Sequence, residues 1–195
     1  MISQAEFVVS AGGAWRLFRF DRSGLDRIDT SVEGAIRSYW LTLILAPLAV
    51  FITAVQWWPF ADRVAFLPLV IGELSLYVIG WLMMPVMVDA AIRLAGLPDR
   101  LPRFIAGYNW ATVITLPIAS AFIALTLVLD VPGPVSGLLA LVVIAMVLVY
   151  QAYVTHLTLE IPVMAAGVIT LGDYFVSLTV GQAVQATLLQ AASAG

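Results

Sequence analysis

Five long apolar stretches with almost no charge dominate this sequence. The first, residues 38–61, lies between Arg37 and Asp62 and contains no charged residue. A helix needs about 20 apolar residues to cross the hydrocarbon core of a bilayer, so a stretch of this length predicts a transmembrane helix. The other candidate spans are residues 64–88, 104–129, 135–159 and 161–181. We therefore expect an all-α polytopic membrane protein, a bundle of five transmembrane helices within residues 38–192.

The composition agrees with this class. Hydrophobic residues make up 62% of the 195 and charged residues 11%, against roughly 25% charged in an ordinary soluble domain. Most of the chain must therefore lie in lipid, which leaves no room for a second soluble domain of about 100 residues. This composition excludes a water-soluble enzyme.

Turn-forming residues separate the expected helices. Pro59 should end the first span, because proline cannot supply an N–H to the helix. Residues 94–103 and residues 130–134 contain proline and glycine and are expected to form loops. The fifth helix has two alternative registers, one starting near Ile161 and one about two turns later, because several glutamines make its far end more polar.

The segment of residues 1–37 should lie at the membrane surface. Its aromatic residues alternate with arginines, which suits aromatics in the headgroup layer and guanidinium groups at phosphate depth. The predicted interface anchors are Trp15, Phe18 and Phe20, with Trp57 and Trp58 at the other face of the membrane. The alternative is a disordered tail. The capping-box spacing from Thr30 to Glu33 predicts a helix that starts near Thr30 and continues into the first span.

Arginine placement predicts the orientation. Eight arginines lie in the N-terminal segment or beside the loop at residues 94–103, whereas Arg63 alone lies on the opposite side. The positive-inside rule then places the N-terminus in the cytoplasm and, after five spans, the C-terminus outside the cytoplasmic (inner) membrane.

The residue types that the sequence lacks exclude several kinds of binding site. The sequence has no Cys, no Lys and one His, and its formal net charge is −3, so we expect no metal, no cofactor and no nucleic acid as partner. No nucleotide-binding or hydrolase motif is present, which predicts a protein that is not an enzyme. The lipid bilayer is the expected partner, with other membrane proteins or a second copy of the chain as further candidates.

Two carboxylates fall inside predicted spans, where a charge costs about 2.5 to 3.5 kcal/mol on insertion scales. We expect Glu73 and Asp173 to face the bundle interior, to lie close together in the outer half of the membrane and to share a proton. The alternative is that each has a separate partner and serves packing alone.

Two further pairs have helical i, i+4 spacing. Asp89 and Arg93 predict an interfacial ion pair, with a headgroup or substrate site as the alternative. His156 and Glu160 predict a local hydrogen bond.

Several short motifs resemble the Yip1 domain family, in particular its small bacterial members. They are the polar lead Asp29-Thr30-Ser31-Val32-Glu33, the run Arg37-Ser38-Tyr39-Trp40 leading to Pro47, and the Arg-bearing loop leading to Gly107-Tyr108 and Pro117. The resemblance covers most of residues 25–190 and implies a non-enzymatic integral membrane protein. The Asp-Leu-x-Gly-Pro signature of the eukaryotic branch is missing, so a role in vesicle traffic is not carried over.

Three function classes are open from the sequence. The first, which we predict, is a scaffold or accessory protein in the cytoplasmic membrane. The second is a small transporter or channel that uses Glu73 and Asp173. The third is an intramembrane enzyme acting on lipid, supported only by Asp89, Arg93 and His156.

Overall fold

The computed structural model describes residues 1–94 and 96–194, with side chains described to residue 190. Within these residues, five helices are long and apolar enough to cross a membrane, which confirms the predicted class of a helical, multi-pass membrane protein. They are α3 (Trp40–Trp57), α4 (Phe66–Leu94), α5 (Leu101–Val128), α6 (Gly133–Leu159) and α7 (Val163–Ala194). Shorter elements are α1 (Gln4–Phe18), η1 (Arg22–Arg27), α2 (Val32–Ser38), η2 (Trp58–Phe60) and η3 (Pro98–Arg100).

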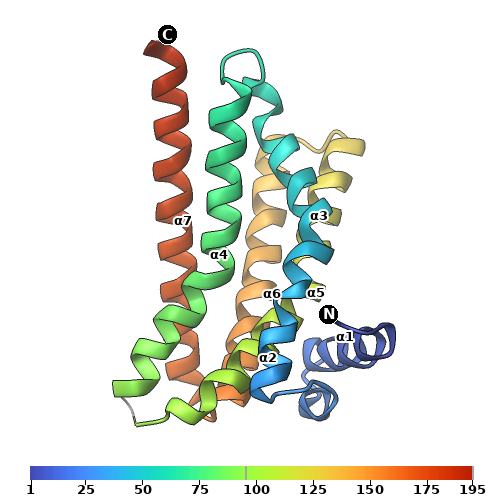
Figure 1. Cartoon of the computed structure of the whole chain (residues 1–195). Helices are drawn as coiled ribbons and strands as arrows, with labels where there is room; N and C mark the ends of the chain where they lie inside the picture. The colour runs from blue at the N-terminus through green and yellow to red at the C-terminus, as the bar shows by residue number, and fades with distance from the viewer. Residues whose placement is uncertain (95, 195) are drawn as a thin grey trace.

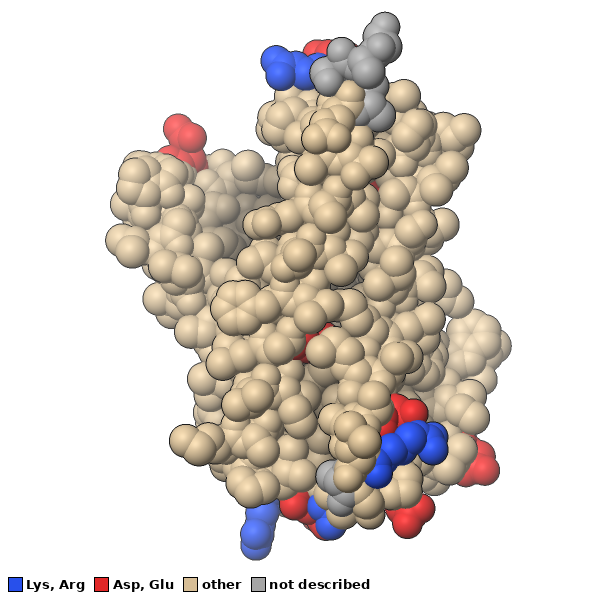
Figure 2. Space-filling view, turned by 90° about the vertical axis from the view of Figure 1, so that its left-hand side faces the viewer, with Lys and Arg blue, Asp and Glu red and all other residues tan. Residues whose placement is uncertain are grey.

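The spanning helices form an upright bundle, and α1 lies crosswise beside its lower part, at the right of the view (Figure 1). The last helix, α7, begins at Val163, near the earlier predicted start, and continues to Ala194, so it contains both predicted registers. Only 6 to 17% of the most apolar window of each span is buried inside the protein, so most of each surface faces outward, as lipid contact requires. Charged side chains gather at the two ends of the molecule and the surface between them is mainly uncharged (Figure 2).

Residues 4–18 form a packed helix, not a disordered tail. The inner face of α1 buries Ala14 and Leu17, and the Ala14 carbonyl accepts a hydrogen bond of 3.0 Å from the hydroxyl of Tyr150 on α6. Phe18 lies edge-on to the ring of Tyr150, and Phe7 contacts the ring of Trp110 on α5. The start of the chain is thus attached to two spanning helices.

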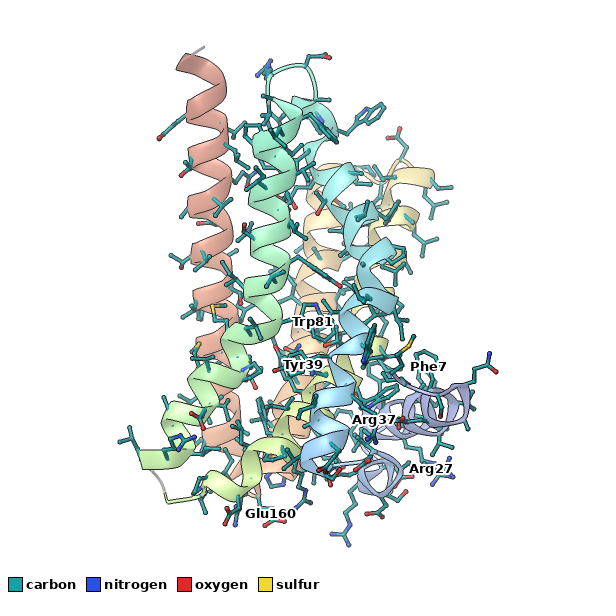
Figure 3. The ribbon with its side chains drawn as sticks, in the orientation of Figure 1. Phe7, Arg27, Arg37, Tyr39, Trp81 and Glu160 are labelled. Atoms are coloured by element: carbon teal, nitrogen blue, oxygen red, sulfur yellow. The ribbon has the colours of Figure 1, made fainter. Side chains whose placement is uncertain are left out.

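Glycines allow η1 to fold back onto α1. A Cβ on Gly13 would lie 2.6 Å from the carbonyl oxygen of Gly24, and a Cβ on Gly24 would clash with the carbonyl oxygen of Gly13. Arg37 then joins α1 to α2, with its Nε 3.1 Å from Glu6 and its Nη2 2.6 Å from Asp29. Figure 3 shows Arg37, Arg27 and Phe7 at this junction.

The predicted helix start near Thr30 is displaced by one residue. Ser31 is the N-cap of α2, and its hydroxyl accepts a hydrogen bond of 3.0 Å from the Gly34 N–H. Asp29 accepts a hydrogen bond from the Ser31 N–H, and the hydrogen bonds from Ser31 lower the pKa of this carboxyl. The predicted continuous helix is interrupted by a one-residue turn at Tyr39, which separates α2 from α3.

Candidate functional site

Glu73 lies on α4 and pairs with α3. Its Oε1 accepts a hydrogen bond of 2.7 Å from the indole Nε1 of Trp57, and its Oε2 accepts one of 3.3 Å from the hydroxyl of Thr53. Both carboxyl oxygens of Glu73 are therefore occupied by side chains of one neighbouring helix.

Asp173 lies on α7 and pairs with α5. Its side chain is buried, and its Oδ2 accepts a hydrogen bond of 3.1 Å from the hydroxyl of Tyr108. No bond to its second oxygen, Oδ1, is found among the described residues.

The prediction that Glu73 and Asp173 share a proton is wrong. Gly72, next to Glu73, lies against Val184 and Leu188, which are 11 and 15 residues beyond Asp173 on α7. At a rise of 1.5 Å per residue, the two carboxylates are about 16 to 22 Å apart along the bundle. The reason is that each carboxylate lies near the start of its own helix, Glu73 in the first third of α4 and Asp173 in the first third of the longer α7. Because these two helices run in opposite directions, Glu73 lies in the upper half of the bundle and Asp173 in the lower half.

Asp173 and Tyr108 line a cavity of about 470 Å³ between α4, α5, α6 and α7. Most of its wall is apolar, including Leu76, Val147 and Trp81. Its polar lining consists of Tyr77, Tyr108, Thr112, Thr115, Gln151, Asp173, Tyr174 and Ser177. Among the lining residues that the structure describes, Asp173 is the only carboxylate, and there is no Arg, Lys or His.

Sequence reasoning missed Tyr108 and the cavity face of α5. The available signal was the series Tyr108, Thr112 and Thr115 within an otherwise apolar span, since their spacing of four and three residues places polar groups on one helix face. Asp173 and Ser177 repeat this spacing on α7.

Two further polar side chains lie below the cavity, outside its lining. Thr155, one turn from Gln151 on α6, and Thr170, one turn from Asp173 on α7, are fully buried. Their hydroxyl oxygens have no hydrogen-bond partner among the described residues. Buried hydroxyls of this kind are commonly satisfied by internal water.

The interfacial ion pair is as predicted: Arg93 Nε lies 2.8 Å from an Asp89 carboxyl oxygen. The predicted bond between His156 and Glu160 is wrong. His156 Nδ1 lies 2.6 Å from the Ile161 carbonyl oxygen, whereas Glu160 pairs with Arg103 and Arg100 at the start of α5. The hydrogen bond from Arg103 is the main cause that lowers the pKa of Glu160.

The predicted interface anchors divide into two groups. Trp15, Phe20 and Trp58 are exposed, by 50, 57 and 80%, and are free to meet lipid. Trp57 is only 3% exposed, so its placement as a lipid anchor is corrected: its indole is held inside the protein by Glu73. Phe18 is half-buried and packs on both Trp15 and Tyr150.

Comparison of the chain with protein-family models, with curated proteins and with solved structures finds no match. The functional argument therefore rests on the cavity and its residues.

Proposed function

We propose that this protein is a non-enzymatic accessory protein of the cytoplasmic membrane that binds a small amphiphilic molecule in the α4–α7 cavity. The cavity itself carries the proposal. Its volume of about 470 Å³ lies within the range of roughly 300–1,000 Å³ typical of small-molecule sites. Its apolar wall with a few convergent polar groups is the usual composition of such a site.

The arginine distribution supports the proposed orientation, with the N-terminus in the cytoplasm and the C-terminus outside. Eight arginines lie within residues 16–37 or residues 93–103, at one end of the bundle, while Arg63 follows η2 at the other end. Membership in the Yip1 domain family stays part of this proposal, on the motifs given above.

A cavity-filling substitution tests the proposed binding. Gly80 lines the cavity, and a Cβ there would meet nothing within 4 Å, so Gly80→Leu should fold and occupy the space. Gly137 on α6 is equally open but does not line the cavity, so Gly137→Leu is the matched control.

The measurement is isothermal titration of the protein in lipid nanodiscs with 4-phenylbutanol, with empty nanodiscs subtracted. We expect saturable binding to the wild type and to Gly137→Leu, and none to Gly80→Leu. Equal binding by Gly80→Leu would show that the cavity is not the site.

A transporter is the second candidate, and Thr155 and Thr170 favour it. Their buried hydroxyls have no partner among the described residues and lie one helical turn from the cavity residues Gln151 and Asp173, toward the lower end. Polar groups in this position suit a water-filled route. In this transporter hypothesis Asp173 carries the proton and Glu73 takes no part. Proton flux into liposomes that is lost in Asp173→Asn and kept in Glu73→Gln would support it, whereas equal flux in all three proteins would oppose it.

A further inference from the structure

The second carboxyl oxygen of Asp173, Oδ1, determines which chemical group of a ligand the cavity can bind. The phenol of Tyr108 can donate one hydrogen bond, and it donates that bond to Oδ2. Oδ1 has no bond to any described side chain, and the residue belongs to the cavity wall. One strong acceptor is thus available to a molecule inside the cavity.

The surroundings of Asp173 supply no positive charge. No cationic side chain occurs among the described lining residues, and the arginines lie at the ends of the bundle. A carboxylate in apolar surroundings is costly unless a cation or several hydrogen bonds compensate it. Glu73 has two such donors and Asp173 has one, so Asp173 is the carboxylate that a bound cation would stabilise.

The rest of the cavity suits an apolar body with an aromatic contact. Trp81 and Tyr77 on α4 pack ring to edge, with centroids 6.3 Å apart, and both line the cavity. Figure 3 shows Trp81 within the bundle. Aromatic faces attract organic cations, and the attraction increases where water is excluded.

We propose that the cavity selects an organic cation: a protonated amine on an apolar body, with the ammonium group bound by Asp173 and the body held by α4 and α6. This inference rests on the proposed function, because it names the ligand class of the same cavity.

Three probes with one carbon skeleton test it: 4-phenylbutylamine, 4-phenylbutanol and 4-phenylbutyrate, which are cationic, neutral and anionic at pH 7. Each is titrated into nanodiscs containing the full chain. A charge-assisted hydrogen bond should make the amine bind about 10- to 100-fold more tightly than the alcohol, and the carboxylate should bind most weakly.

Two carboxylate variants locate the preference. Asp173→Asn keeps the acceptor for Tyr108 but removes the charge, so the amine should lose its advantage while alcohol binding stays within about threefold. Glu73→Gln is the matched control, since it removes the other intramembrane carboxylate outside the cavity, and it should keep the full preference.

The outcomes separate the two proposals. Equal affinity of the wild type for amine and alcohol, or an unchanged preference in Asp173→Asn, would overturn the inference and leave the cavity as a site for neutral amphiphiles. A loss of preference in Glu73→Gln would also overturn it. Absence of binding by all three probes would overturn both the inference and the proposed function. The affinities of the wild type for the amine and the alcohol test the preference for a cation even if a variant fails to fold.

Discussion

The indole Nε1 of Trp57 donates a hydrogen bond of 2.7 Å to the carboxyl Oε1 of Glu73. This bond joins the end of α3 to the first half of α4. The bond keeps the Trp57 ring inside the protein, away from the lipid interface. It also holds the Glu73 carboxylate against α3, far from Asp173. The pair is therefore a structural contact between successive helices, and its energy can be measured.

Trp57→Phe should lower the free energy of unfolding by about 1 to 2 kcal/mol, because it leaves a partly buried carboxyl oxygen without its closest donor. Glu73→Gln should be milder, since the Gln oxygen can still accept from the indole. Thermal unfolding in detergent gives both values, and a double-mutant cycle isolates the bond. A larger loss for Glu73→Gln than for Trp57→Phe would contradict this account.

Gly13→Ala should loosen the attachment of η1 to α1. Alanine normally gains about 0.5 to 1 kcal/mol over glycine in a helix, but overpacking costs about 1 to 3 kcal/mol, and here the new Cβ meets a backbone carbonyl. Gly12→Ala is the control, because its nearest contact is the end of the Arg27 side chain at 3.7 Å. Limited proteolysis should cut the N-terminal segment faster in Gly13→Ala alone, and equal rates would show that the close approach is unimportant.

The Glu160 pair should give a defined pH dependence. Arg103 lowers the pKa of Glu160 below its ordinary 4.5, so the stabilisation is fully present above that value and is lost as the pH falls through the lower, folded-state pKa. Arg103→Gln should therefore reduce the melting temperature near pH 7, and its difference from the wild type should shrink in acid. Arg63→Gln, at the other end of the bundle, should show no such trend. A difference that grows on acidification would reverse the sign and refute the assignment.

The outer face of α1 should contact the cytoplasmic leaflet. Val8 and Trp15 are 70 and 50% exposed, and burying each such side chain in lipid should contribute about 1 to 3 kcal/mol. Because the chain has no Cys, single spin labels can be placed at positions 8 and 15, with exposed Arg22 as a reference. The first two should be accessible to oxygen and the third to a water-soluble nickel chelate. Equal water accessibility at all three would remove α1 from the membrane surface.

A phosphatase fused after the C-terminus should be active, and a fluorescent protein fused there should be dark, if the C-terminus is external. The reason is the excess of arginine at the opposite end of the bundle. A phosphatase inserted in the α4–α5 connection is the internal control and should be inactive. The inverted pattern would place the arginine-rich end outside.

The class, the five spans and the Asp89–Arg93 pair could all be read from the sequence. Span length depends on consecutive apolar residues, and an i, i+4 pair depends on the geometry of one helix, so both are local properties. The Ser31 cap was displaced by only one residue for the same reason.

The partners of Glu73, Asp173 and Glu160 were decided by the tertiary structure alone. Tyr108 and Asp173 are 65 residues apart, and their contact depends on how far α5 and α7 are offset and rotated. In a membrane protein, lipid-facing and protein-facing surfaces are both apolar, so hydrophobic periodicity does not identify the inner face of a span. The sequence determined which segments cross the membrane. Packing between helices that are distant in the sequence determined that Glu73 is hydrogen-bonded by Trp57 and that Asp173 faces a cavity.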